Sequence, residues 1–128
     1  MDRDAVLATY EQLVASFREG RWGEKFTYFA ADATVVDGGR FFGSLDDYRS
    51  AWERWAAQHD DLPVPASVDT TVMELQMFGG VAVLTHAIDS REEPDSNDTE
   101  GEIETIVFAK QPEGRWQIVH QHIAPRAD

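Results

Sequence analysis

The sequence predicts an α+β fold, in which helices pack against one face of a curved antiparallel β-sheet. The first half of the 128-residue chain carries segments with helical spacing of apolar residues, and the second half carries four long segments rich in β-branched and aromatic residues. The last of these, 114–125, is apolar on both faces, which is typical of a strand covered on both sides. This strand therefore belongs inside the sheet, with a pocket on one face and a partner on the other.

Three helices are expected in the first half of the chain. Apolar residues recur at steps of three and four over 4–19, and Gly20 follows as a stop signal. A second, shorter helix is expected at 21–29. The third helix covers 45–58, because the Ser44 hydroxyl can cap its first turn and acidic residues follow where the helix dipole favours them.

The strands are separated by turn signals. Short strands are predicted at 32–37 and 40–42, with a turn at Gly38 and Gly39 between them. A proline-containing connector at 60–65 then leads into the second half of the chain. The four long antiparallel strands are expected at 66–78, 81–91, 99–110 and 114–125.

Composition limits the kinds of function that the chain can have. We expect one domain over residues 1–128. With 24 acidic and 11 basic residues the formal charge is -13, so neither nucleic acid nor an anionic membrane surface is expected as a partner. Because there is no cysteine, disulfides, thiol nucleophiles and thiolate metal sites are excluded. No apolar stretch is long enough to span a bilayer and no targeting segment is visible, so a cytoplasmic protein is expected.

Three motifs carry a family resemblance: Asp32-Ala-Thr-Val-Val-Asp37-Gly, Phe42-Gly-Ser at a helix start, and the closing Gly-Arg-Trp-Gln-Ile-Val-His-Gln-His. With the order of elements, they resemble the SnoaL-like and ketosteroid isomerase-like families of the nuclear transport factor 2 superfamily. The closing motif is most similar to the branch that contains the association domain of calcium/calmodulin-dependent kinases. The resemblance covers nearly the whole chain. It implies a cone-shaped curved sheet with helices on its concave face, the cystatin-like or nuclear transport factor 2-like fold.

The resemblance also implies two catalytic positions. Asp37 corresponds to the general base of a ketosteroid isomerase, and Gln121 to the acid-base aspartate of SnoaL-like polyketide cyclases. An amide such as Gln121 cannot take a proton, although it can orient a substrate carbonyl or a water. The tyrosine and the second acid of the isomerase correspond to Leu13 and Ile106, neither of which can donate a hydrogen bond. Steroid isomerisation is therefore not expected.

The same alignment assigns the residues of the cavity. It turns Val119, Gln121 and Ile123 inward, and it places Thr85 and Ile106 where the kinase association domains carry arginines. An anionic ligand held by arginines is therefore not expected. Aromatic residues of the helices would complete a wall suited to a small hydrophobic or aromatic substrate, unless they are simply core. These residues are Tyr10, Tyr48, Trp52 and Trp55.

Two groups of carboxylates remain open to alternative interpretations. Asp37 follows an apolar strand and is a candidate for a partly desolvated base, or it is a turn residue that bonds the amides of Gly38 and Gly39. Glu102 and Glu104 share a strand face with Ile106 and Phe108, which the resemblance turns toward the cavity. They are either a second acid or solvated side chains at the strand start, and the solvated interpretation is preferred.

His120 and His122 stand on one face of the last strand, about 7 Å apart. They could share a metal with His86 if that residue lies on the same outer face, but no third ligand is assigned and a metal site is not expected. The preferred interpretation is a homodimer interface on the outer face, where Trp116 and Ile118 supply apolar area.

The sequence thus predicts a small enzyme that needs no cofactor, an isomerase, cyclase or hydratase, in which Asp37 moves a proton and Gln121 positions a small-molecule substrate. The alternative is a ligand-binding or oligomerisation module without catalysis.

Overall fold

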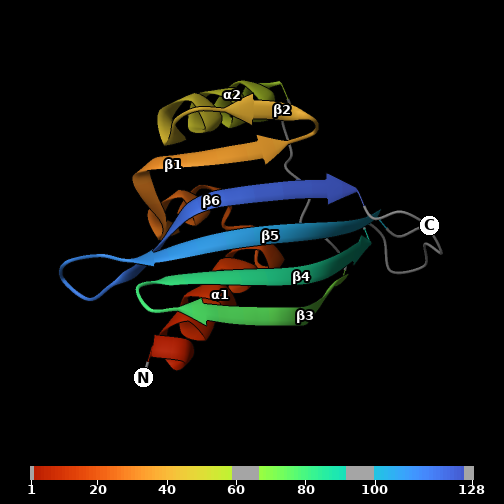
Figure 1. Cartoon of the computed structure of the whole chain (residues 1–128). Coiled ribbons are helices and arrows are strands. Elements are labelled where there is room, and N and C mark those ends of the chain that lie inside the picture. The colour runs from red at the N-terminus through yellow and green to blue at the C-terminus, as the bar shows by residue number, and fades with distance from the viewer. Residues whose placement is uncertain (1, 59–66, 92–99, 126–128) are drawn as a thin grey trace.

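The computed structural model describes residues 2–58, 67–91 and 100–125. The connector predicted at 60–65 and the loop after the fourth strand lie outside these ranges. In chain order (Figure 1), the described elements are α1 (Asp2–Arg18), the 3-10 helix η1 (Trp22–Tyr28), β1 (Phe29–Asp37), β2 (Arg40–Phe42), α2 (Leu45–Ala57), β3 (Ser67–Phe78), β4 (Val81–Arg91), β5 (Glu100–Lys110) and β6 (Trp116–Pro125). The chain therefore has the predicted α+β architecture.

The strands form one mixed sheet in the order β2-β1-β6-β5-β4-β3. The predicted interior position of the last strand is confirmed, because β6 lies between β1 and β5. The long strands pair antiparallel with one another, as does the β1–β2 hairpin. β1 and β6 are instead parallel neighbours, and their arrows run the same way in Figure 1.

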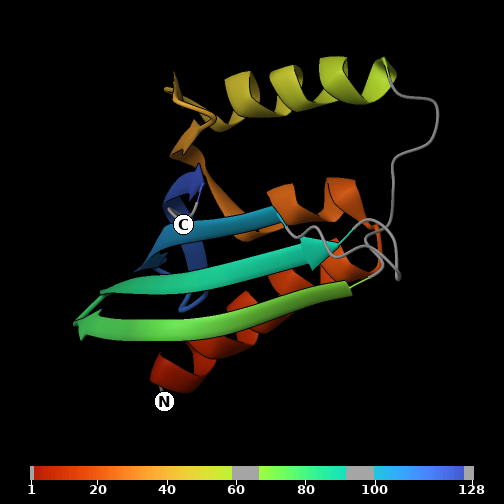
Figure 2. The ribbon, with the colours of Figure 1, turned by 90° about the vertical axis from the view of Figure 1, so that its right-hand side faces the viewer.

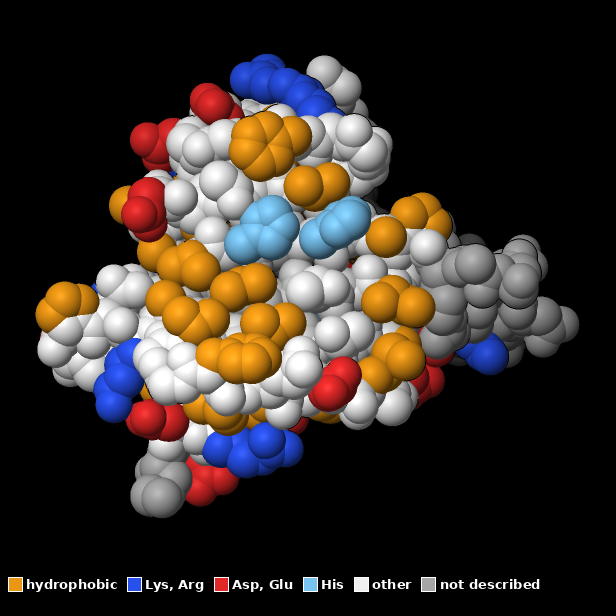
Figure 3. Space-filling view, in the orientation of Figure 1, with side chains coloured by type: hydrophobic (Ala, Val, Ile, Leu, Met, Phe, Trp, Pro, Cys, Tyr) orange, Lys and Arg blue, Asp and Glu red, His pale blue; other side chains and the backbone are white. Residues whose placement is uncertain are grey.

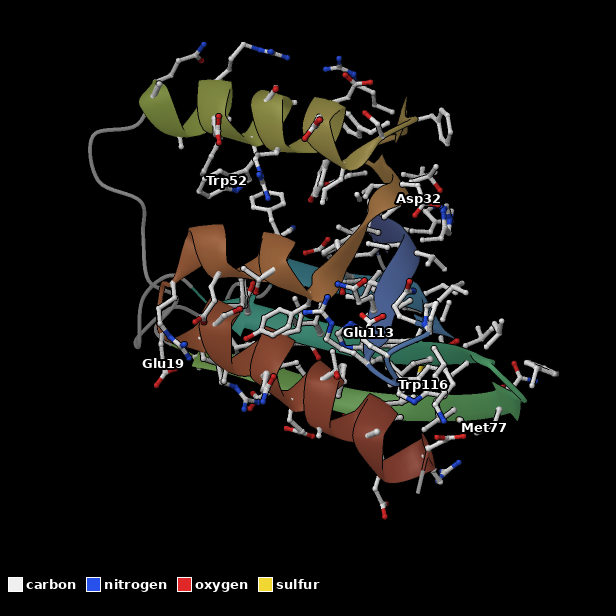
Figure 4. All side chains as sticks on the ribbon, turned by 90° about the vertical axis from the view of Figure 1, so that its left-hand side faces the viewer. Glu19, Asp32, Trp52, Met77, Glu113 and Trp116 are labelled. Carbon is white, nitrogen blue, oxygen red and sulfur yellow. The ribbon has the colours of Figure 1, made fainter. Side chains whose placement is uncertain are left out.

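A β-bulge in β6 changes which side chains face the helices. Ile118 pairs with Phe108 of β5, and His120 pairs with the adjacent Val107, so β6 carries an extra residue, Val119, between these pairs. The extra residue shifts the alternation of side chains by one position. Trp116 and Ile118 therefore belong to the hydrophobic core, with 3% and 0% of their surface exposed. Their predicted position on the outer face is wrong, and Figure 4 shows Trp116 on the side of the sheet that α1 covers.

The core lies between the concave face of the sheet and the helices. α1 buries Val6, Tyr10 and Val14, one to each turn, against apolar side chains of the central strands. Figure 2 shows α1 and η1 packed along the sheet, while α2 lies above β1 and β2 at one edge. α2 begins as predicted, since the Ser44 hydroxyl accepts a hydrogen bond from the Asp47 amide at 3.1 Å. No helix of the described residues is long and apolar enough to cross a membrane.

No helix covers the outer face of the sheet among the described elements. In Figure 3 this face presents two histidine side chains in the middle of apolar side chains. They are His120, which is half-buried, and His122, which is exposed, since the third described histidine, His86, is buried. The Nδ1 atom of His120 lies 2.7 Å from the Thr34 hydroxyl on β1.

Candidate functional site

A cavity of about 310 Å³ lies between the helices and the concave face of the sheet. Its wall is apolar over a large part, and Trp52 comes from the side of α2 that faces η1 and α1 (Figure 4). Six apolar residues from α1, α2, β4 and β6 line it: Leu13, Val14, Phe17, Trp52, Ile88 and Ile123. Such a wall suits a small organic molecule better than an ion.

Four cavity residues form one row across four neighbouring strands. Asp37 of β1 is in register with Ile123 of β6, Ile123 with Glu104 of β5, and Glu104 with His86 of β4. All four line the cavity. Because neighbouring strands lie about 4.8 Å apart, the Cα atoms of Asp37 and Glu104 are about 10 Å apart. Two carboxylates thus flank Ile123 on the floor of the cavity.

Asp37, the first carboxylate of this row, is oriented by α2 and η1. The Tyr48 hydroxyl donates to Oδ2 of Asp37 at 3.3 Å and accepts a hydrogen bond from Nζ of Lys25 at 2.8 Å. Burial raises the pKa of the Tyr48 phenol, and the nearby Lys25 ammonium opposes part of this rise. Tyr48 is therefore a neutral donor at physiological pH. Among the described residues the donor to the Asp37 side chain is Tyr48, not an amide of the following turn.

The second carboxylate, Glu104, is oriented by a buried chain of hydrogen bonds. Its Oε2 lies 2.6 Å from Nε2 of His86 and 3.3 Å from Nε2 of Gln121. An ionised carboxylate only accepts hydrogen bonds, so both nitrogen atoms donate to it. In the tautomer that carries its proton on Nε2, the Nδ1 of His86 accepts from the Tyr10 hydroxyl, which is 2.9 Å away. Burial raises the pKa of Tyr10, which keeps this hydroxyl protonated.

Both side chains of the Tyr10 and His86 pair are sequestered from solvent. Tyr10 is 1% exposed and His86 is 2% exposed, and their rings pack edge to face with centroids 5.1 Å apart. The side chain of Glu104 is 12% exposed and lines the cavity. His86 and Tyr10 therefore lie behind Glu104 and hold its carboxylate in place at the cavity wall.

The structure brings five of the predicted site residues to the cavity wall, namely Asp37, Tyr48, Trp52, Gln121 and Ile123. Tyr10 lies behind the wall and reaches the site through His86.

The other four predicted site residues do not line the cavity. Trp55 is 46% exposed and is not part of the cavity wall. Thr85 lies between Leu84 and His86, whose side chains are buried on the concave face, so strand alternation turns Thr85 to the outer face. Ile106 is 0% exposed and fills the core. Val119 is the extra residue of the bulge in β6 and is not part of the cavity wall.

Sequence reasoning did not assign three polar side chains of the cavity wall. The face of His86 was left open, with the outer face considered for a metal, although Leu84 and Ile88, two residues to either side, share its inward face and were the available signal. Glu104 was expected to be solvated, although Ile106 on the same strand face indicated the inward direction. Lys25 precedes a buried phenylalanine in η1, and no pattern in the sequence marks it.

No three histidine, aspartate or glutamate side chains in the described ranges are grouped as a metal site. His86 faces the cavity while His120 and His122 lie on the opposite face of the sheet, so these histidines cannot share one ion.

The family model described as a SnoaL-like domain matches residues 6–127. No curated protein matches the chain in sequence. Among solved structures, an NTF-2 like protein of unknown function from Shewanella oneidensis is 16% identical, with a TM-score of 0.78 and coverage of 96% of this chain and 98% of that one. A proposed ketosteroid isomerase from Shewanella frigidimarina is 24% identical, with a TM-score of 0.71 and 94% coverage of each chain. The CaMKII hub of S. rosetta is 21% identical, with a TM-score of 0.70 and coverage of 96% and 95%. At these identities the likeness shows the shared fold.

Proposed function

The chain belongs to the SnoaL-like domain family, and on this premise we propose that it is a small enzyme that moves a proton within a small hydrophobic or aromatic substrate. The observation that carries the proposal is Asp37, a half-buried carboxylate that lines an otherwise largely apolar cavity and is oriented by Tyr48. The reaction is of the isomerase, cyclase or hydratase type, and it needs no cofactor because acid–base groups suffice for proton transfer.

The chemistry assigned to Asp37 follows from its surroundings. Tyr48 bonds to Oδ2, which leaves Oδ1 available to accept a proton from a substrate carbon next to a carbonyl group. Trp52 and Ile123, which line the same cavity, supply apolar surface on which a substrate can rest next to this carboxylate. Gln121, two residues before Ile123 on the same strand, positions the substrate.

The test is proton exchange, because it requires no knowledge of the product. The protein is incubated in D₂O with a panel of small cyclic and aromatic ketones, and NMR follows the loss of the proton signals next to the carbonyl. We expect at least one ketone to exchange faster with the wild type than with Asp37→Asn, by about a hundredfold if Asp37 is the general base. The melting temperature of the variant should be nearly unchanged, since asparagine has the same shape and can still accept from Tyr48.

Asp32→Asn is the matched control, because Asp32 lies on the same strand and is exposed. This variant should exchange protons at the wild-type rate. Exchange that is equal in all three proteins, or absent for every ketone, would refute the proposal.

A second candidate function is a non-catalytic ligand-binding or oligomerisation module. The observation in its favour is the uncovered outer face of the sheet, where histidines and half-buried apolar side chains lie together (Figure 3). We assign a homodimer contact to His120, His122 and Val107 on β6 and β5, in place of the buried Trp116 and Ile118. Light scattering coupled to gel filtration should give a dimer for the wild type and a monomer for Val107→Glu. A monomeric wild type would contradict the proposed homodimer.

The cytoplasmic location of the protein stays a prediction.

A further inference from the structure

We propose that the Glu104 end of the cavity is a subsite for a hydrogen-bond donor, so that the ligand is a small apolar molecule carrying a hydroxyl or amino group. This inference rests on the proposed function only in taking the cavity as the ligand site. It concerns residues that the family resemblance does not assign, namely Glu104, His86 and Tyr10.

The first argument is the inventory of polar atoms at this end of the cavity. Glu104 offers carboxylate oxygens, which accept hydrogen bonds and cannot donate when ionised. The neighbouring N–H group of His86 and one N–H of Gln121 are already directed at Oε2 of Glu104. The Tyr10 hydroxyl is used by His86. The donors next to Glu104 are therefore already used, and the remaining acceptor capacity of its carboxylate is complementary to a ligand O–H or N–H group.

The second argument is the state of Gln121. Its side-chain oxygen Oε1 is buried and has no hydrogen-bond partner among the described residues, and the residue is 4% exposed. The orientation of the amide is fixed, because turning the oxygen toward the Glu104 carboxylate would replace attraction by repulsion. A buried acceptor without a donor is unfavourable, and a small turn of this side chain toward the cavity that it lines would let a donor group of a ligand relieve it. Gln121 therefore favours a hydroxyl or amino group rather than the substrate carbonyl that the sequence suggested.

The third argument is the row of residues on the sheet. Asp37 and Glu104 lie on either side of Ile123, about 10 Å apart between Cα atoms. A planar ring resting on Ile123, with Trp52 as part of the wall, would place a substituent against Glu104 and a ring edge or side arm against Asp37. Glu104 is a binding residue in this arrangement, while His86 and Tyr10 are positioning residues that act through it.

The experiment compares two probes that differ in one property. Phenol and anisole share an aromatic ring and an oxygen atom, but only phenol has an O–H to donate. Their dissociation constants are measured from ¹H–¹⁵N chemical-shift titrations of the full chain. We expect the wild type to bind phenol at least about ten times more tightly than anisole, as befits a hydrogen bond to a charged acceptor. The largest shifts should come from the amides around Glu104, Gln121 and Ile123.

Two variants test which residue causes the preference for phenol over anisole. Glu104→Gln should weaken phenol binding roughly tenfold and leave anisole binding unchanged. Glu74→Gln is the matched control: it makes the same chemical change on another strand of the sheet, at an exposed residue outside the cavity wall. This control should keep the wild-type ratio of the two affinities. The measurement on the wild type needs no variant, so the proposal remains testable if Glu104→Gln fails to fold.

Several results would overturn the proposal. They are equal affinities of the wild type for phenol and anisole, no shift of any cavity amide at millimolar phenol, or a preference that survives in Glu104→Gln. A preference that is lost in Asp37→Asn instead would place the donor site at Asp37. The outcome is separate from that of the proposed enzyme, because a phenol preference without any proton exchange would keep the subsite and reject the catalysis.

Discussion

Replacing Tyr10 with phenylalanine tests the buried hydrogen-bond chain beneath Glu104. The substitution removes one oxygen atom and keeps the ring that packs against His86 with centroids 5.1 Å apart. It leaves Nδ1 of His86 without its 2.9 Å partner in a side chain that is 2% exposed. A buried polar atom that loses its partner destabilises a protein by about 1–3 kcal/mol. For a domain of this size that corresponds to a melting temperature lower by roughly 3–10 °C.

The assay is urea unfolding at neutral pH, supported by thermal melting. Tyr28→Phe is the control, because Tyr28 is half-buried and its hydroxyl bonds to no other described residue. This variant should stay within about 0.5 kcal/mol of the wild type. If Tyr10→Phe is as stable as Tyr28→Phe, Tyr10 does not hold His86 in place. The hydrogen-bond chain from Tyr10 through His86 would then not orient Glu104.

Two further predictions concern a turn and the pH dependence of stability. Gly79, in the β3–β4 turn, has a φ of 64°, whereas its neighbour Gly80 has no positive φ, so Gly79→Ala should lower the free energy of unfolding by about 1–2 kcal/mol and Gly80→Ala should change it less. Urea unfolding of both variants decides this, and equal effects would contradict it. Burial raises the pKa of Tyr10 and Tyr48 above the ordinary value of 10.0, so the folded state binds these protons more tightly than the unfolded state. Their contribution to stability is complete below about pH 9 and is lost as the pH rises through the raised values. Absorbance titration of the phenols should show the same upward shift, and ordinary values for all three tyrosines would refute it.

The fold could be predicted because it depends on local patterns that the structure keeps. The helical spacing over α1, the Ser44 cap and the glycine turns each specify an element without reference to distant residues. The apolar character of both faces of β6 correctly indicated an interior strand. In β6, strand alternation failed where an extra residue enters the ladder, whereas Thr85 on β4 was misplaced by the family resemblance, since the pairing of β4 with β5 has no bulge. The bulge at Val119 leaves no mark in the apolar pattern, and it alone moved Trp116 and Ile118 from the outer face to the core.

Part of the cavity could be predicted from the family resemblance and from local spacing. Asp37 and Gln121 were found by resemblance, and Tyr48 and Trp52 by helical spacing, and all four line the cavity. The chain from Tyr10 to Glu104 depends on contacts between residues up to 76 positions apart, and no local pattern encodes such a pairing. A histidine between two buried aliphatic residues on a strand is a signal that deserves weight in similar sequences.

The most direct test of a ligand cavity flanked by two carboxylates is a high-resolution crystal structure of protein purified without added ligand. We predict residual density for a small organic molecule over Ile123, with Asp37 on one side and Glu104 on the other. A cavity closed by Leu13 and Trp52, with no space above Ile123, would mean that this region is packed core, and it would contradict both the enzyme and the donor subsite.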